Sequence, residues 1–300
     1  MPPAKATTMR GAAWAAAAVV TGIVAVSGVM GPAGNAFSTG SPDSSLSRAA
    51  SGQAASGKAA ALKPGSANPA VAASAHVRNA GNGRLEAVLP DIGKTVLLIG
   101  DSQSEPVDGW PRLGLAAAGY NVYFCGRGGT GYVAANGATG NYVDALQRGD
   151  WLLPSGTPAL IVIEGGGNDA AGGASNAQIA RNAERLITEL RGRYPGTRLA
   201  IIGTLARGAN DGGGRRSEVD ALLGAVAAAN GMPFISTGDW LTRYGLAKDL
   251  ADAVHMNPEG RVALGGILGR RLRELGLDRN PAAGQDALAA VPGSDSTFQD

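Results

Sequence analysis

The chain has 300 residues, of which 44% are hydrophobic, and this length suits one folded domain of about 200 residues with extensions. Seven of the 26 Lys and Arg residues but only one of the 24 Asp and Glu residues lie in residues 1–85, so the net charge of +2 hides a basic segment followed by a slightly acidic remainder. The remainder has no basic stripe, which argues against nucleic acid as a partner, and the single cysteine, Cys125, excludes an internal disulfide.

The first 36 residues have the pattern of a secretory signal peptide. Lys5 and Arg10 precede an apolar run over residues 11–30, and small residues follow through Ala36. The run is long for a signal, so a membrane anchor formed by residues 11–30 is the alternative. We therefore expect a secreted or cell-envelope-associated protein.

Two segments of low complexity flank the middle of the chain. Residues 37–85 are rich in Ala, Ser, Gly and Pro without a sustained period, which predicts a disordered linker that contains His76. Residues 278–300 are again loop-like and predict a flexible C-terminal tail. A folded domain is therefore expected over residues 86–277.

Within this domain, short apolar runs alternate with amphipathic segments. Strands are predicted over residues 95–99, 121–125, 159–163, 198–202 and 234–236. Helices are predicted over residues 110–118, 176–193, 217–230 (with Ser217 as its N-cap) and 259–275. Strands that are apolar throughout indicate a parallel sheet covered on both faces. The fold class expected is α/β, a three-layer α/β/α flavodoxin-like sandwich around a central parallel sheet of about five strands.

Ligands of such sheets bind beyond the carboxyl ends of the strands, and Ser102 directly follows the first predicted strand. A serine becomes a nucleophile only beside a base that is itself oriented by a third group. Of the two histidines, His76 lies in the predicted linker and His255 just before the last helix. Asp252 precedes His255 by three residues, close enough on a tight turn to hold one ring nitrogen. Taken alone, the pair also fits a solvent-exposed histidine near a helix start.

Acyl transfer further needs hydrogen-bond donors for the oxyanion that develops. The loop after the second strand contains Gly128 and Gly129, whose backbone N–H groups are accessible because no Cβ shields them. The loop after the third strand contains Asn168, whose amide is a neutral donor. Chain flexibility for the glycines, and a turn or helix cap for Asn168, are the structural alternatives.

Together these blocks resemble the SGNH/GDSL hydrolase family. Four blocks carry the resemblance, in the family's order: Gly100-Asp101-Ser102, the glycine loop 126–131, Gly166-Gly167-Asn168-Asp169, and Asp252-Ala253-Val254-His255. The resemblance spans about residues 94–276. Gln103 departs from the family pattern, because Leu is common after the nucleophile.

The resemblance implies a role for each matched residue. Ser102 is the expected nucleophile, His255 the general base and Asp252 its orienting acid. The expected oxyanion hole combines the backbone N–H groups of Ser102 and Gly129 with the Asn168 side chain. Gly128 is the alternative to Gly129, which is preferred because a polar residue follows it.

The function that the resemblance implies is that of an exported serine esterase acting on short-chain acyl or O-acetyl esters. An O-acyltransferase with a carbohydrate acceptor and a non-catalytic wall-associated binding protein are the alternatives. We expect a monomer with an acyl ester of a small molecule or glycan as its partner.

Other motifs are weaker. Residues 126–131 satisfy the glycine spacing of a dinucleotide-binding loop, but glycine and turn residues follow where that loop needs a helix. Ser104 stands where the nucleophile elbow of α/β-hydrolases needs a glycine. No cluster has the spacing of metal ligands, so neither cofactor nor metal is expected.

Overall fold

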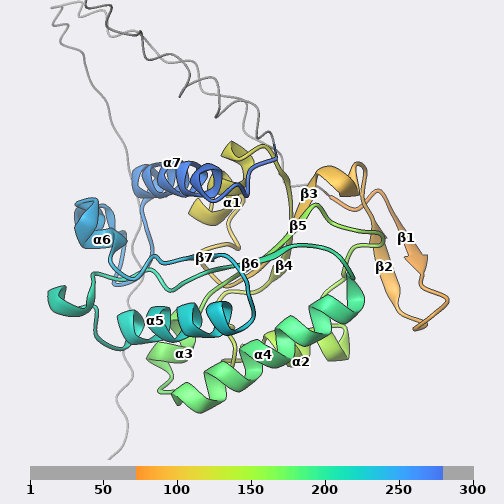
Figure 1. Cartoon of the computed structure of the whole chain (residues 1–300), viewed down its shortest axis with the longest axis horizontal. Coiled ribbons are helices and arrows are strands. Elements are labelled where there is room, and N and C mark those ends of the chain that lie inside the picture. Colours follow the sequence, from red (N-terminus) through yellow and green to blue (C-terminus); the bar gives the residue numbers. More distant parts are fainter. Residues whose placement is uncertain (1–71, 280–300) are drawn as a thin grey trace, which may run out of the picture. The chain divides into compact units, whose positions relative to one another are not determined.

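The computed structural model describes residues 72–279, shown in colour in Figure 1. The predicted signal peptide or anchor, residues 1–36, lies outside the described residues, as do residues 37–71 of the predicted linker and 280–300 of the predicted tail. None of the described helices has the length and hydropathy needed to cross a membrane.

A five-stranded sheet, parallel throughout, forms the centre of the fold, in the order β4-β3-β5-β6-β7. The strands are β3 (Thr95–Gly100), β4 (Asn121–Gly126), β5 (Leu160–Glu164), β6 (Leu199–Ile202) and β7 (Phe234–Ile235). Counted along the chain, this order is that of flavodoxin-like sheets, with the first strand between the second and the third. The predicted fold class is confirmed.

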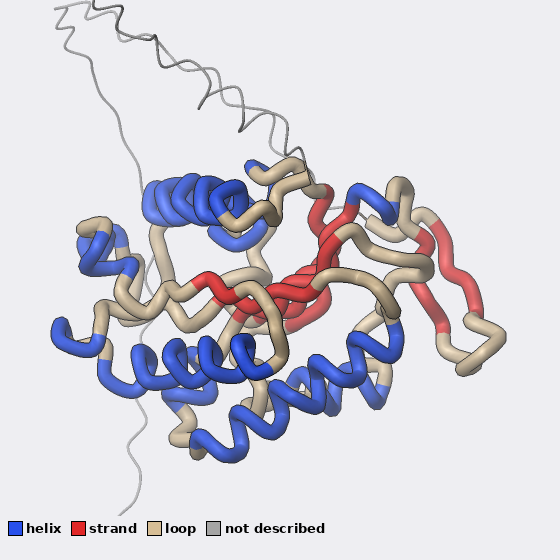
Figure 2. Tube along the Cα trace, in the orientation of Figure 1, coloured by secondary structure: helices blue, strands red, loops and turns tan. Residues whose placement is uncertain are grey.

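Helices cover both faces of the sheet (Figures 1 and 2). On one face lie α1 (Trp110–Ala117), α6 (Trp240–Arg243) and α7 (Pro258–Glu274). On the other lie α2 (Tyr142–Arg148), α3 (Gly167–Ala171), α4 (Asn176–Arg193) and α5 (Gly214–Ala229). Short 3-10 turns span Ile92–Lys94, Ala209–Asp211 and Leu246–Asp249.

The two cores follow from the alternation of side chains along each strand. In β3, Leu97 and Ile99 pack beneath the sheet with α4 and α5, while Val96 and Leu98 pack against α1 and α7. All six residues of β3 are buried because the strand is paired on both sides and covered on both faces. A central strand of this kind holds whatever follows it in a fixed place.

The described elements begin and end within a few residues of the predictions, with one incorrect cap. Helix α5 begins at Gly214, so Ser217 lies inside the helix, where its hydroxyl donates to the Gly238 carbonyl oxygen at 3.0 Å. The short helices α2, α3 and α6 were not predicted, because they have four to seven residues and too few turns for a clear period.

The prediction of a disordered linker through residue 85 is wrong for its described end. Residues Ala75–Arg78 (β1) and Leu85–Val88 (β2) form an antiparallel hairpin, and His76 lies in β1. The hairpin is held by partners distant in sequence: Arg193 pairs with Glu86 at 2.6 Å, and the Ala87 N–H donates to the Leu153 carbonyl at 2.9 Å. Such partners leave no local period in the sequence.

The C-terminal boundary also lies slightly later than predicted. Leu277 is buried, and its carbonyl accepts a bond from the Tyr120 hydroxyl at 2.8 Å. The Arg279 N–H then donates to the Ala118 carbonyl at 2.9 Å. The chain is therefore fastened to the end of α1 through Arg279, inside the segment predicted as a tail.

Candidate active site

The turn after β3 presents Ser102 at the carboxyl edge of the sheet. The Asp101 carbonyl accepts bonds from the N–H groups of Ser104 at 3.1 Å and Glu105 at 2.9 Å, and the Asp101 side chain accepts one from the Gln103 N–H at 2.9 Å. A Cβ at Gly100 would lie 2.7 Å from the Ser104 side chain, so only glycine lets the chain fold back here. These contacts explain why Gly, Asp and Ser occur in this order.

Helix α1 holds the same turn from one side. Arg112 is 9% exposed, and its guanidinium donates to the carbonyl oxygens of Ser104 at 2.6 Å and Glu105 at 2.9 Å. It also lies 4.5 Å from the centre of the Phe124 ring, over its face. A buried cation with these partners fixes the turn, and burial lowers the pKa of Arg112 while Glu105 raises it.

The three predicted triad side chains lie together. The His255 Nε2 is 2.8 Å from the Ser102 Oγ, and its Nδ1 is 2.8 Å from the Asp252 Oδ2. The other Asp252 oxygen accepts from the backbone N–H groups of His255 at 2.7 Å and Val254 at 2.8 Å. These two backbone bonds, and then the imidazole, hold the pKa of Asp252 well below its ordinary value. The Asp252 carboxylate is therefore ionised at neutral pH, and its exposure to solvent favours the same charged form.

The loop that carries His255 is closed at its base by the start of α7. The Asn257 side chain caps that helix by accepting from the Gly260 N–H at 2.8 Å, and Pro258 occupies its first turn. The Ala251 N–H donates to the His255 carbonyl at 2.8 Å, and the Asn257 N–H to the Asp249 carbonyl at 2.8 Å. The loop is thus a short, internally bonded turn.

The glycine loop, which holds the predicted backbone donors Gly128 and Gly129, passes beside Ser102. A Cβ placed on Gly128 would lie 3.3 Å from the Ser102 Cβ, so the glycine loop passes directly beside the serine. The Gly128 N–H already donates to the Glu105 carboxylate at 2.9 Å, whereas no described group accepts from the Gly129 N–H. Gly129 has a φ of +79°, which favours glycine. These contacts favour Gly129 over Gly128 as the available donor.

Asn168 lies in the first turn of α3 and is already bonded. Its Nδ2 donates to the Thr130 carbonyl at 2.9 Å and to the Asp101 carboxylate at 3.2 Å. Both partners are acceptors, so the amide nitrogen faces the nucleophile turn and the glycine loop. Asn168 therefore links the nucleophile turn to the glycine loop.

Asp169, for which the sequence suggested no role, fixes the glycine loop. Its buried carboxylate accepts from three consecutive backbone N–H groups, those of Tyr132 at 2.9 Å, Val133 at 2.7 Å and Ala134 at 2.8 Å. Asn168 and Asp169 thus act on the same loop from adjacent positions. The signal in the sequence was the carboxylate next to a candidate donor, but its backbone partners lie more than thirty residues away.

Replacing Asp169 by Ala is expected to lower kcat by about 10–100-fold, because a misplaced donor loop no longer meets the oxyanion. It should also destabilise the fold by about 3–5 kcal/mol, since buried N–H groups lose a charged acceptor. Steady-state kinetics and thermal melts measure both, with Asp169→Asn as the milder variant and Asp91→Asn, on a carboxylate that is 58% exposed, as the control. An Asp169→Ala enzyme with wild-type kcat would contradict this role.

A second buried carboxylate, that of Glu164, contacts the turn that carries Ser102. Glu164 ends β5, and its Oε2 accepts from the Ser104 hydroxyl at 2.7 Å. Burial first, and then the Asp101 carboxylate, raise the pKa of Glu164 well above its ordinary value. Burial likewise raises the pKa of Asp101 to about 6, against the opposing hydrogen bond from Gln103. The folded protein therefore keeps protons on this pair that the unfolded chain has released.

This difference predicts a stability that falls as pH rises. The folded state binds more protons above about pH 4.5, so unfolding becomes easier between pH 5 and 8. Glu164→Gln should reduce the fall, so that its melting temperature relative to wild type rises by several degrees from pH 5 to pH 8. Glu218→Gln, on an exposed side chain paired with Arg215, should keep the wild-type dependence. A parallel pH dependence in wild type and Glu164→Gln would contradict the assignment.

A pocket of about 250 Å³ opens beside Ser102 and His255. Its remaining lining residues are Gln103, Glu105, Pro106, Trp110, Met256 and Arg261. Arg261 is paired with Asp108 at 2.8 Å, and Glu105 is held by the Gly128 N–H. The pocket thus combines a small apolar wall with charged side chains. Trp110 lines the pocket, whereas Tyr132 is buried against Tyr142 and the Asn136 side chain donates to the Gly128 carbonyl at 2.6 Å.

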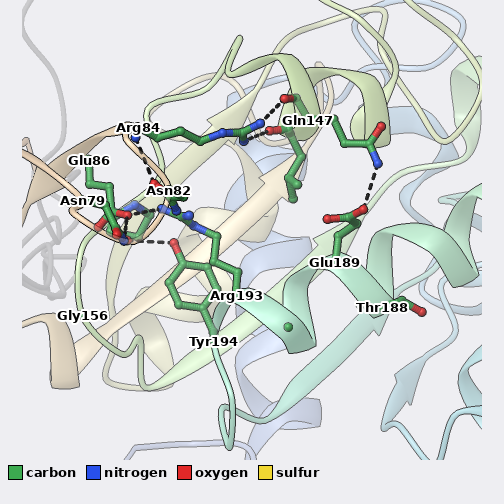
Figure 3. Close-up of a pocket in the computed structure, with 13 residues that line it drawn as sticks. Asn79, Asn82, Arg84, Glu86, Gln147, Gly156, Thr188, Glu189, Arg193 and Tyr194 are labelled. Atoms are coloured by element: carbon green, nitrogen blue, oxygen red, sulfur yellow. Dashed lines mark hydrogen bonds and ion pairs between the residues drawn. The ribbon is translucent and has the colours of Figure 1, made fainter.

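A larger cavity, of about 640 Å³, lies between the β1–β2 hairpin and helices α2 and α4 (Figure 3). None of Ser102, His255 and Asp252 lines it. Its polar side chains bond mainly to each other: Glu86 accepts from Asn79 and Arg193, and Gln147 donates to Glu189 at 2.8 Å. These bonds fasten the hairpin to the domain. Within residues 72–279, no three or more His, Cys, Asp and Glu side chains gather as a metal site would require.

The sequence and the fold are similar to those of known proteins. The family model described as the GDSL-like Lipase/Acylhydrolase family matches residues 98–263. No curated protein sequence matches the chain. Similar solved structures include a lipolytic G-D-S-L family protein from Veillonella parvula, at 19% identity and a TM-score of 0.46 over 59% of this chain and 97% of that one. A carbohydrate acetylesterase from Sinorhizobium meliloti has 17% identity and a TM-score of 0.44 over 61% of this chain and 99% of that one. An aryl esterase from M. smegmatis has 18% identity and a TM-score of 0.43 over 61% of this chain and 99% of that one.

The family match runs from within β3 into α7 and so includes all four blocks around Ser102, Gly129, Asn168 and His255. Since it covers more than half of the residues, the chain belongs to the GDSL-like lipase and acylhydrolase family and is a carboxylic ester hydrolase of the SGNH type.

Proposed function

We propose that the chain is an exported serine esterase that hydrolyses short-chain acyl or O-acetyl esters through Ser102, His255 and Asp252. The observation that carries the proposal is the pair of 2.8 Å contacts that join the serine hydroxyl to the imidazole and the imidazole to the carboxylate. A nucleophile, a base within hydrogen-bond reach and an orienting acid are the parts that acyl transfer requires.

The proposed reaction begins when the Ser102 Oγ attacks the ester carbonyl carbon and its proton passes to the His255 Nε2. The imidazolium that forms is stabilised by the ionised Asp252 carboxylate on the opposite ring nitrogen. The oxyanion accepts hydrogen bonds from the backbone N–H groups of Ser102 and Gly129 and from the Asn168 amide, each worth roughly 2.7–4 kcal/mol of the barrier.

Collapse of the tetrahedral intermediate breaks the bond to the alkoxide, which takes the proton from His255 and leaves as the alcohol. Water then attacks the acyl–Ser102 ester while His255 accepts its proton. A second collapse breaks the ester bond to Ser102, whose Oγ takes that proton back from His255, and releases the carboxylic acid. The half-exposed imidazole supports this step, since 37% of the His255 side chain reaches solvent and water has access to it.

The size and polarity of the pocket support a short acyl group. Its volume is about 250 Å³, and Glu105 and Arg261 line it together with Trp110 and Met256. A long alkyl chain gains about 0.8 kcal/mol for each methylene only where it is buried against apolar groups. Beside two charged side chains it would instead impair their hydration, so acetyl esters suit this pocket better than long-chain esters.

The test of the proposed function is hydrolysis of p-nitrophenyl acetate, butyrate and octanoate by the purified full chain. We expect kcat/KM to fall by about tenfold or more from acetate to octanoate, because a pocket of about 250 Å³ with charged side chains in its lining gives the longer chain little further apolar contact. A preference for octanoate would contradict the proposed substrate class. A folded protein that hydrolyses none of the three would contradict the esterase and favour an O-acyltransferase with a carbohydrate acceptor.

Export is the second part of the proposal and rests on the sequence pattern of residues 1–36. The test is expression of the full chain and of a chain that lacks residues 2–36, followed by fractionation of cells and medium. Full-length protein in the medium or envelope, with the shorter chain retained inside the cell, is the expected result. Retention of both chains in the cytosol would overturn this part.

A further inference from the structure

The Gln103 side chain, where the family commonly has Leu, is buried and bonded at both ends. It is 8% exposed, its Oε1 accepts from the Trp110 indole N–H at 3.0 Å, and its Nε2 donates to the Val254 carbonyl at 2.9 Å. An indole can only donate and a backbone carbonyl can only accept, so these two partners determine which way the amide faces. Leucine at this position could make neither bond.

The bond to Val254 reaches the loop that carries the general base. Apart from that bond, the backbone hydrogen bonds within residues 251–255 are internal to the turn: the Ala251 N–H donates to the His255 carbonyl, and the N–H groups of Val254 and His255 donate to the Asp252 side chain. In the part of the chain that the structure describes, only Ser102 and Gln103 bond to these five residues from outside the segment 249–257.

The exposure of this loop makes the external bond important. Asp252 is 55% exposed and His255 is 37% exposed in their side chains, so little packing restrains them. The Ser102–His255 bond is broken and remade in each catalytic cycle and cannot itself hold the loop throughout. Gln103 is adjacent to Ser102 in the chain, and its bond to Val254 therefore ties the base loop to the nucleophile turn.

We propose that Gln103 is a positioning residue, which holds the His255 loop in register with Ser102 by bridging Trp110 and Val254. This inference rests on the proposed function for its kinetic consequence, although the tether itself does not. Without the bridge, the loop is expected to spend most of its time in conformations in which the His255 Nε2 is not within hydrogen-bond reach of the Ser102 Oγ. The loss should appear in kcat, because proton transfer needs alignment, and little in KM, because the other residues that line the pocket remain.

Two variants separate the parts of the bridge. Gln103→Met fills similar space but makes neither hydrogen bond. Gln103→Glu, while ionised, still accepts from the Trp110 indole but has no N–H for the Val254 carbonyl, so it removes only the tether. The matched control is Gln147→Met, which removes one side-chain bond, to Glu189, on α2 and outside the pocket beside Ser102.

The full chain and these variants are compared in two measurements: kcat and KM with p-nitrophenyl acetate, and hydrogen exchange of the amides of residues 250–257. We expect both Gln103 variants to lose about tenfold in kcat with KM changed by less than about twofold. The loop amides should exchange faster in both variants and at the wild-type rate in Gln147→Met.

Unchanged kcat in both Gln103 variants, or unchanged exchange in the loop, would overturn the proposal. A loss of kcat without faster loop exchange would also overturn it, because Gln103 would then act by another route. Failure of the proposed function gives a different result, since the wild type itself would lack esterase activity. The exchange measurement still decides the tether in that case.

Discussion

Ser102→Ala is expected to lower kcat for p-nitrophenyl acetate by about 10⁴-fold or more, because no other described group is placed to attack the carbonyl next to His255. The variant removes one oxygen from a half-exposed turn whose fold depends on Gly100, Asp101 and Arg112. Its melting temperature should therefore stay close to that of the wild type. Kinetics and circular dichroism on the same preparations check both statements.

The double variant Ser102→Ala/His255→Ala sharpens this prediction. Residues that act as one unit in catalysis have effects that do not add, so the double variant should be about as slow as either single variant. Losses that multiply in the double variant would show that Ser102 and His255 act independently. That result would contradict the shared proton transfer implied by their 2.8 Å contact.

His255→Ala is expected to cost a similar factor of about 10⁴ in kcat, because the serine then has no base. The structure suggests a way to restore the activity of this variant. The imidazole is 37% exposed and lines the pocket beside Ser102, so free imidazole from solution can enter the space that alanine leaves. The activity of His255→Ala should rise with imidazole concentration, while that of Ser102→Ala should not.

The comparison of these two variants distinguishes loss of a base from loss of structure. Imidazole that restores neither variant, with His255→Ala folded, would weaken the assignment of the base. Imidazole that raises the rates of both variants equally would indicate solution catalysis without the enzyme. Only selective rescue of His255→Ala supports proton transfer at this position.

The sequence allowed the central sheet to be predicted because its strands are buried on both faces. Continuous apolar runs such as residues 95–99 and 159–163 have no other simple explanation, and the long helix α4 was predicted with its observed ends. The β1–β2 hairpin was missed because its stability comes from Arg193 and the Leu153 carbonyl, more than sixty residues away. No local pattern encodes such partners.

For the site, the sequence indicated which residue types would meet but not what holds them. Ser102, His255 and Asp252 could be selected because the chain has two histidines, Ser102 directly follows a predicted strand, and Asp252 and His255 lie just before the last predicted helix. The residues that hold these three side chains in place were not predicted. Asp169 accepts from three N–H groups of another loop, Glu164 at the end of a neighbouring strand accepts from Ser104, and Gln103 bonds to Trp110 and to Val254. Each contact depends on how segments pack in space, which spacing along the chain does not give.

The most direct test of the central claim, that Ser102 is the nucleophile, is covalent trapping with a fluorophosphonate ester followed by mass spectrometry of the digested full chain. The account predicts one adduct, on the peptide that contains Ser102, formed quickly in the wild type, slowly in His255→Ala and not at all in Ser102→Ala. An adduct on another residue, accompanied by loss of esterase activity while Ser102 remains unmodified, would contradict it.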